Sequence, residues 1–309
     1  MTDKIKSLGA ALEEYSASRE GAVIIKYDES LSRHTTFRIG GNADLYLIPH
    51  SVDSLVDVIR IVRDSGVKFY ILGNGSNVLF DDAGFSGVVI SMSGLTNVKV
   101  DGDVITADAG ATLASVCKAA REGSLEGLEF AYGIPGSVGG AVFMNAGAYG
   151  GEMAHVLRDS TYLDLDDLSV HTISNAEHNY GYRESVYKHT RRVILSATFE
   201  LKAGDREEIS EKMSDYMNRR VTKQPLEFPS AGSVFKRYPG RFTGQMIEEA
   251  GLKGTTIGGA QVSEKHAGFV INKGGATCQD VLGLMKQIHD IVLEQTGISL
   301  EPEVRILGE

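Results

Sequence analysis

"GIPGSVGGAVFMNAGAYG" (133–150) contains six glycines together with Ser137, Asn145 and Tyr149. Because glycine costs backbone entropy on folding, a stretch with this many glycines is expected where φ must be positive or where another group approaches the backbone closely. A cofactor lying along the stretch explains this composition, and a set of glycine-rich turns between strands is the alternative. The stretch therefore predicts either a cofactor-binding segment or a connection within a sheet-rich region.

A second glycine loop, "GNGSN" (73–77), follows the apolar segment "VKFYIL" (67–72), which is typical of a strand. Successive small residues can direct backbone N–H groups into a concave nest that binds an anion. The loop does not have the G-x-G-x-x-G spacing of a dinucleotide-binding turn, and a tight connecting loop is the alternative.

The composition predicts a globular protein of two or three packed units. The chain has 309 residues, 42% of them hydrophobic, and its net charge of −10 argues against general binding to nucleic acid or to an anionic membrane. Cys117 and Cys278 are the only cysteines, which predicts a reducing compartment and no metal site. The N-terminus has no hydrophobic signal core, and no apolar run nears the ~18 residues of a membrane span. We therefore expect a cytoplasmic protein without a membrane, nucleic-acid or obligate protein partner.

The first two thirds of the chain mix strands and helices. Residues 43–49 alternate like a strand, Ser51 can cap a helix that ends at Gly66, and 67–72 form the next strand of a βαβ unit. Asp101-Gly102 is the turn pair of a predicted tight hairpin, and Cys117 lies on the apolar face of a further helix. Additional strands are predicted at 87–92, 160–173 and 192–201.

The sequence changes in character near Ala203, where we place a domain boundary. Residues 205–225 predict a helix, and a last helix runs from a Thr277 cap to Gly297. The inward face of the first of these helices carries Ile209, Met213, Tyr216 and Met217.

Residues 299–307 predict a closing strand. Period-two geometry places Glu301, Glu303 and Arg305 on one face, while Val304 and Ile306 face the core.

Six motifs in order resemble one known family. "HTTFRIGGNAD" (34–44), "ILGNGSNVLF" (71–80) and the stretch 133–150 resemble the FAD-binding segments of the UDP-N-acetylenolpyruvoylglucosamine reductase (MurB) family. "YGYRESVYK" (180–188), "AGSVFKRYPG" (231–240) and "EPEVRILG" (301–308) match the segments that carry that family's chemistry. The resemblance runs nearly the full length of the chain.

The resemblance implies an α+β fold of the vanillyl-alcohol-oxidase (PCMH) type. Residues 1–95 and 96–203 would form the two parts of the FAD-binding region, and 204–309 would form a C-terminal α+β domain for the UDP-sugar. The residues expected to bind FAD are Arg38, Gly73, Asn74, Gly75, Ser76, Asn77, Gly133, Ile134, Pro135, Gly136, Ser137, Gly139, Gly140, Asn145, Gly147 and Ala148.

The implied reaction is the NADPH-dependent reduction of UDP-N-acetylglucosamine enolpyruvate in peptidoglycan precursor synthesis. Such a site needs a cation at the substrate carboxylate and an acid for the neighbouring carbon. Arg183 offers a bidentate fork for the carboxylate, and Ser233 always carries a proton at neutral pH. The resemblance assigns Glu303 to the same site, where its carboxyl group would orient Arg183 or, if it is held protonated, donate a hydrogen bond. Without the resemblance, Ser233 is a turn or cap hydroxyl, and Arg183 and Glu303 belong to solvated surfaces.

The resemblance also implies a substrate-binding group of Tyr182, Arg219, Lys223 and Arg237. Arg219 and Lys223 would face the UDP diphosphate, although the cations at this helix end, Arg219, Arg220 and Lys223, are also favourable partners for the helix dipole. Positive charge would gather here because an acidic protein otherwise repels an anionic substrate.

One segment departs from part of the family. Some members carry an insertion after the Tyr-Arg motif with a tyrosine that closes over the substrate, whereas "SVYKHTRR" (185–192) leads directly into the next predicted strand. Tyr149, Tyr187 and Tyr238 are candidates to cover the uridine, and each is equally a candidate packing residue.

Two further functions stay open at the level of sequence. A flavin oxidase or dehydrogenase of the same fold would need a base, and the glycine loops contain no His or Cys suited to covalent flavin attachment. A non-catalytic nucleotide-binding module would have no need of the Ser, Arg and Glu set. For His34 and His266 we expect hydrogen-bonded structural roles.

Overall fold

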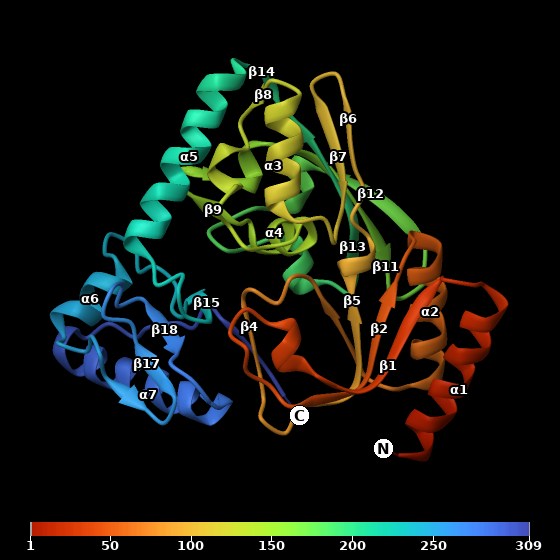
Figure 1. Cartoon of the computed structure of the whole chain (residues 1–309), viewed down its shortest axis with the longest axis horizontal. Coiled ribbons are helices and arrows are strands. Elements are labelled where there is room, and N and C mark those ends of the chain that lie inside the picture. The colour runs from red at the N-terminus through yellow and green to blue at the C-terminus, as the bar shows by residue number, and fades with distance from the viewer. Residues whose placement is uncertain (1, 309) are drawn as a thin grey trace. The chain divides into compact units, whose positions relative to one another are not determined.

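The computed structural model describes residues 2–308, which divide into two compact units. Unit 1 comprises residues 1–26, 45–74 and 87–220, and unit 2 comprises 27–44, 75–86 and 221–309. Each unit has a hydrophobic core of its own. Most of the helices and strands are labelled in Figure 1.

The first sheet is built around the predicted βαβ unit. Its strand order is β1-β2-β5-β3, and β3 and β5 are parallel. The strands are β1 (Val23–Ser30), β2 (Asn42–Pro49), β3 (Phe69–Leu72) and β5 (Phe85–Ser91). The expected helix, α2 (Val52–Ser65), begins with a capping box at Ser51 and ends at Gly66, whose φ of +63° is left-handed. The strand, helix and strand predicted here are confirmed.

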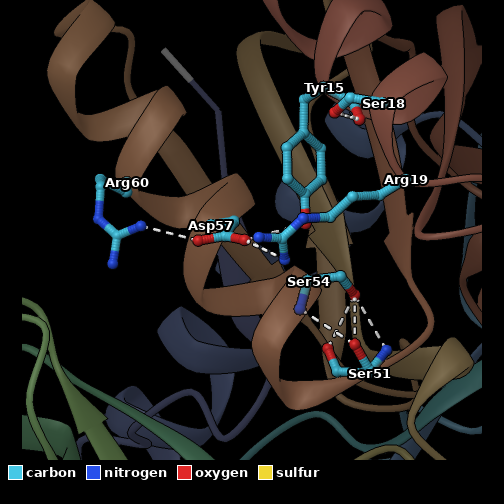
Figure 2. A network of polar contacts seen from close by, with 7 residues as sticks. All are labelled: Tyr15, Ser18, Arg19, Ser51, Ser54, Asp57 and Arg60. Atoms are coloured by element: carbon cyan, nitrogen blue, oxygen red, sulfur yellow. Dashed lines mark hydrogen bonds and ion pairs between the residues drawn. The ribbon is translucent and has the colours of Figure 1, made fainter.

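An N-terminal helix, α1 (Asp3–Ser18), lies beside α2, as Figure 1 shows. Asp57 of α2 accepts hydrogen bonds from Tyr15 (3.2 Å), Arg19 (2.9 Å) and Arg60 (2.7 Å), which is the network drawn in Figure 2. Because Asp57 is largely shielded while both arginines are half exposed, this cluster fastens α1 at its C-terminal end by modest charge-assisted bonds.

An antiparallel five-stranded sheet forms the second part of unit 1, in the order β12-β11-β13-β7-β6. Its strands are β6 (Val98–Asp101), β7 (Val104–Asp108), β11 (Leu157–Asp164), β12 (Val170–Ser174) and β13 (Arg192–Glu200). The predicted hairpin is present, but its turn is shifted by one residue. Asp101 pairs with Val104, so Gly102 and Asp103 form the loop, and Gly102 has the positive φ (+62°) that the first loop position of a type II′ turn requires.

Three helices accompany this sheet in unit 1. They are α3 (Leu113–Glu122), α4 (Val138–Met144) and α5 (Arg206–Lys223), the last of which reaches unit 2 at its final turn. Helix α3 contacts β6 and β7, and α4 contacts β7 and β13. Cys117 of α3 is buried as expected, and this burial raises the pKa of its thiol, so it is a core residue. Ile209 and Met213 of α5 face the core.

Unit 2 is built on a four-stranded antiparallel sheet in the order β15-β18-β17-β16. Its strands are β15 (Ser230–Ser233), β16 (Thr256–Ile257), β17 (Ala260–Val262) and β18 (Phe269–Asn272). Helix α7 (Cys278–Thr296) packs against β16 and β17 and contacts α6 (Thr243–Glu249). The Thr277 cap and the Gly297 end of α7 are as predicted, and Asp82 adds a second cap by accepting the N–H groups of Cys278 (2.7 Å) and Gln279 (3.1 Å).

The closing strand is shorter than predicted. Only β19 (Arg305–Leu307) is a strand, and it pairs in parallel with β4 (Val78–Phe80). Val304 is buried, but Ile306 is 47% exposed, so the expectation that both face the core is wrong for Ile306. A bend at Val304 interrupts the period-two pattern between Glu303 and Ile306.

The division into domains 1–95, 96–203 and 204–309 stays a prediction, because it concerns which ligand each part binds. Among residues 2–308, no helix is both long and apolar enough to cross a membrane. The same residues contain no group of three His, Cys, Asp or Glu side chains placed to hold a metal ion.

Candidate active site

Unit 2 brings the serine segment and the closing segment together. The N–H of Glu303 donates to the carbonyl of Val234 (2.8 Å), and the N–H of Lys236 donates to the carbonyl of Glu301 (2.8 Å). Phe235 and Pro302 form a bridge between these two bonds. Ser233, the last residue of β15, therefore immediately precedes the residue whose carbonyl binds the backbone of Glu303.

Ser233 is half-buried, and within residues 2–308 its hydroxyl makes no hydrogen bond to the protein. Its strand is irregular here, because the pairing with β18 shifts between Ser230 and Ser233 around Gly232, whose φ is +78°. An irregular strand end re-aims the side chain that follows it. The hydroxyl is thus held on an ordered backbone while its proton stays available.

The second glycine loop joins the same place in unit 2. The side-chain amide of Asn77 donates to the carbonyl of Glu303 (3.1 Å), and the N–H of Arg305 donates to the carbonyl of Asn77 (3.0 Å). Gly75 has a φ of +63°, and a Cβ on it would lie 2.1 Å from the carbonyl oxygen of His34, so only glycine fits. The loop, the serine segment and the closing segment thus form one bonded cluster.

The segment around Arg38 completes this cluster. Thr36 donates its N–H to the carbonyl of Gly75 (3.1 Å) and its hydroxyl to the carbonyl of Ser230 (2.7 Å). Arg38 is exposed and left-handed, with a φ of +56°. Four predicted residues, Arg38, Asn77, Ser233 and Glu303, are therefore anchored to one backbone network.

Arg183 lies in unit 1, next to the long glycine-rich stretch. Its guanidinium donates to the carbonyls of Asn145 (3.3 Å) and Gly147 (3.4 Å) and lies 5.1 Å from the ring centre of Tyr182. Asn145 is fully buried in a left-handed conformation, and its side chain donates to Gly181 (3.0 Å) and accepts from Ala154 (3.0 Å). Unit 1 thus joins Arg183 to two of the residues expected to bind FAD.

The glycine-rich stretch encloses the short helix α4, which Ser137 caps. Asn74 donates its side-chain amide to the carbonyl of Pro135 (2.7 Å), and a Cβ on Gly73 would lie 2.4 Å from the Ser137 hydroxyl. Within unit 1, the start of the 73–77 loop therefore contacts the start of the 133–150 stretch. A Cβ on Gly139 would lie 2.9 Å from that of Ala109, and one on Gly147 would lie 2.7 Å from the carbonyl of Gly151. These two glycines are needed by the protein's own packing.

The loops have features that suit a phosphate-bearing cofactor. Inside unit 2, the N–H groups of Gly75, Ser76 and Asn77 donate no hydrogen bond, and consecutive N–H groups in a turn make an anion-binding nest. In unit 1, Pro135 and Gly140 are exposed, and nothing lies within 4 Å of a Cβ built on Gly150. The residues expected to bind FAD therefore fit that group.

The three cations predicted to bind the substrate have different surroundings. Arg219 pairs with Asp215 (2.8 Å) in a half-exposed ion pair, which contributes little to stability and leaves the arginine able to change partners. Lys223 is exposed. Arg237 stacks on the exposed Phe242, with its guanidinium carbon 4.9 Å from the ring centre. Their contact with a diphosphate stays a prediction.

Arg220 is a residue that the sequence reasoning missed. Its side chain lies along Gly133, where a Cβ would come within 3.0 Å of the Cδ of Arg220, and burial lowers its pKa. Among residues 2–308 it has no ion pair or hydrogen bond. The signal was present, because Arg220 continues the inward row of Ile209, Met213 and Tyr216 along α5.

The three tyrosines proposed to cover the uridine differ in exposure. Tyr187 is 2% exposed and its hydroxyl lies 2.6 Å from that of Ser160, so it is a packing residue. Tyr149 stacks on Tyr216, with 4.6 Å between ring centres. Tyr238 is exposed in a turn that bridges to Arg241. Burial removes Tyr187 from the candidates, while Tyr149 and Tyr238 remain.

His34 and His266 have the structural roles expected of them. His34 lies 2.8 Å from a carboxylate oxygen of Glu29, and His266 accepts the N–H of Gly268 (3.1 Å) while its ring meets Phe269 edge-on.

Comparison with known families agrees with this arrangement. Residues 43–174 match the model of an FAD binding domain, and residues 224–307 match that of the UDP-N-acetylenolpyruvoylglucosamine reductase C-terminal domain. The predicted fold class is confirmed as α+β, with an FAD-binding region followed by a C-terminal domain, while its assignment to the vanillyl-alcohol-oxidase type stays a prediction.

Individual relatives match over nearly their whole length. The UDP-N-acetylenolpyruvoylglucosamine reductase of Clostridium perfringens is 48% identical over 284 residues, which is 92% of this chain and 93% of the relative. That of Caldanaerobacter subterraneus is 47% identical over 94% of this chain and 95% of its own. The crystal structure of the enzyme from Thermus caldophilus superimposes with a TM-score of 0.77 at 32% identity, covering 92% of this chain and 98% of that one.

Proposed function

Because the chain belongs to the UDP-N-acetylenolpyruvoylglucosamine reductase family, we propose that it reduces UDP-N-acetylglucosamine enolpyruvate to UDP-N-acetylmuramate, with FAD as cofactor and NADPH as reductant. Bound FAD supplies the chemistry of taking a hydride from NADPH and delivering it to the enolpyruvyl methylene carbon. The proposed setting is peptidoglycan precursor synthesis in the cytoplasm. The observation that carries the proposal is the bonded cluster of unit 2, in which Ser233 adjoins the Val234–Glu303 bond and Asn77.

Hydride addition to the methylene leaves negative charge on the neighbouring carbon and its carboxylate. Arg183 is proposed to hold that carboxylate, because a guanidinium offers two parallel donors that gain strength as charge develops. Its guanidinium donates to the carbonyls of Asn145 (3.3 Å) and Gly147 (3.4 Å), and these bonds help to orient the fork.

Ser233 is proposed to donate the proton that completes the reduction. A serine hydroxyl is a weak acid, but a carbanion-like centre is a strong enough base to take its proton. In support, this hydroxyl makes no hydrogen bond to residues 2–308. Glu303, fixed through its backbone to Val234 and Asn77, is proposed to orient Arg183 or, when protonated, to donate a second hydrogen bond.

Binding is divided among two sets of residues. The two glycine loops and Arg38 are proposed to hold FAD, and Arg220 adds a cation beside Gly133. Tyr182, Arg219, Lys223 and Arg237 are proposed to bind the substrate, the three cations through its diphosphate. Since the net charge is −10, this local positive charge counteracts the repulsion that an anionic substrate meets.

The test is an anaerobic experiment on the two half-reactions. The purified protein should be yellow, should bleach with NADPH, and should recover its colour when the enolpyruvyl UDP-sugar is added. A colourless protein would favour a nucleotide-binding module, and bleaching by a simple alcohol would favour an oxidase. Repeating the experiment with NADH in place of NADPH establishes the nucleotide preference.

The assigned role of Ser233 has a matched control in its own strand. Ser233→Ala should be bleached by NADPH at a rate within about twofold of wild type, but should be reoxidised by substrate at least about 100-fold more slowly. Ser230→Ala, three residues earlier in β15, should behave as wild type in both steps. Near-normal reoxidation of Ser233→Ala would remove Ser233 from this role.

A further inference from the structure

The backbone of Arg183 has an uncommon conformation. Its φ is +55°, in the left-handed region that a non-glycine residue occupies only when its surroundings hold it there. Arg183 lies in the short link between the 3-10 turns Asn175–His178 and Val186–His189. Such conformations gather at functional sites, so the groups that hold this one bear on the reaction.

Lys188 is one of the groups that hold it. Its ammonium donates to the carbonyl oxygen of Arg183 at 2.9 Å and pairs with the carboxylate of Glu184 at 3.4 Å. The side chain of Lys188 is only 22% exposed, so the bond is partly shielded from water. A charge-assisted bond to a shielded carbonyl is stronger than a neutral one and fixes the peptide plane that follows Arg183.

The rest of the link is bonded as tightly. Gly181 and Glu184 exchange both backbone hydrogen bonds (3.2 and 3.1 Å), which closes a tight loop around Arg183. The side chain of Asn145 binds the carbonyl of Gly181, and the hydroxyl of Ser185 binds the carbonyl of Phe143 (2.7 Å). These contacts hold the backbone on both sides of Arg183, and Lys188 adds a bond to the Arg183 carbonyl oxygen.

We propose that Lys188 is a positioning residue for the reduction, and that it acts by fixing the Arg183 carbonyl so that the guanidinium meets the substrate carboxylate. This inference rests on the role of Arg183 in the proposed function. When Lys188 cannot donate, the peptide after Arg183 keeps the bond from its Glu184 N–H to Gly181 but loses the bond to its carbonyl oxygen, so the left-handed conformation is held less firmly. A displacement of about 1 Å at a reacting group can cost about 100-fold in rate.

The experiment compares Lys188→Met, Lys188→Arg and a control, Lys118→Met, in the FAD-loaded protein. Methionine keeps an apolar stem of similar length but cannot donate, and arginine restores a donor. Lys118 is exposed on α3. We expect Lys188→Met to slow reoxidation by the enolpyruvyl UDP-sugar about 10- to 100-fold and to raise its KM, while NADPH bleaching stays within about twofold of wild type. Lys188→Arg should recover most of the rate, and Lys118→Met should match wild type.

Two results would overturn the inference. The first is reoxidation of Lys188→Met by substrate at the wild-type rate. The second is an equal decrease in the rates of bleaching and reoxidation, together with release of the flavin and a lower Tm, which indicates a general structural role. Should Lys188→Met not fold, Glu184→Gln removes the ion pair that steadies the ammonium and should slow reoxidation about 2- to 5-fold, again without slowing bleaching; an unchanged rate counts against the inference.

Arg183→Gln separates this inference from the proposed function. If Arg183→Gln reoxidises normally, the role proposed for Arg183 fails, and the inference fails with it. If Arg183→Gln is slow while Lys188→Met is normal, only the inference fails.

Discussion

Replacing Asn145 with alanine should destabilise the protein by about 3 kcal/mol. The side chain of Asn145 is fully buried and makes two hydrogen bonds, one to the carbonyl of Gly181 and one from the N–H of Ala154, both of 3.0 Å. Losing a buried bond and leaving its partner unsatisfied costs about 1 to 1.5 kcal/mol at each site. The left-handed φ of +43° adds about 1 kcal/mol, since asparagine tolerates this conformation better than alanine.

Glycine at the same position separates these two contributions. Asn145→Gly also loses both bonds but accepts the left-handed φ, so it should be more stable than Asn145→Ala by about 1 kcal/mol. Urea unfolding followed by far-UV circular dichroism, at one fixed FAD concentration, gives the three free energies of unfolding. A loss below about 0.5 kcal/mol in Asn145→Ala would refute the bonding argument. Equal stability of the alanine and glycine variants would refute the conformational one.

Three further predictions concern binding, packing and pH. Arg220→Met should raise the Kd of the apoprotein for FAD about tenfold in a flavin fluorescence titration, because Arg220 lies beside Gly133 without an ion pair and is available to a phosphate. The control is Arg206→Met, which changes an exposed residue of the same helix and should leave this Kd unchanged. Asp57→Asn should lower the free energy of unfolding, measured with urea, by about 1 kcal/mol, because it weakens the contacts of Tyr15 and Arg19 that hold α1. If the mutation lowers this free energy as much at high salt as at low salt, the ionic part of the explanation is contradicted. Burial lowers the pKa of His178, against the opposing effect of Glu177 and Asp159, so the folded state favours the neutral imidazole. Its contribution to the free energy of unfolding should be complete above a pH of about 6.5 and should fall as the pH drops below that value. The prediction is contradicted if a His178→Gln variant shows the same dependence of the free energy of unfolding on pH between pH 7.5 and 5.5 as wild type.

Local structure was predictable from the sequence wherever one residue fixes the backbone. Ser51 and Gly66 bound α2, and Thr277 and Gly297 bound α7, because caps act within one turn of the helix. Ile306 shows where such reasoning ends. Period two assumes a straight strand, and the bend at Val304 interrupts it, so that Arg305 and Ile306 are both exposed.

The candidate site was predictable as a set of motifs but not as a set of contacts. Resemblance named Ser233 and Glu303, whereas the bonds that join their segments through Val234 and Asn77 span more than 60 positions of sequence and leave no local pattern. Arg220 was missed for a different reason. A charge on an inward helix row was read as part of the basic helix end, although the spacing already placed it beside Tyr216 and Met213.

The interleaving of the two units has a consequence for the nascent chain. Each unit is assembled from three separate stretches, so no single cut releases either of them whole. Strand β4, near residue 79, is synthesised long before its partner β19, near residue 306, and the two can pair only after β19 has been made. At about 5 to 20 residues per second, that wait lasts roughly 10 to 50 s, during which the edge of β4 is uncovered and open to chaperones or to pairing with another chain.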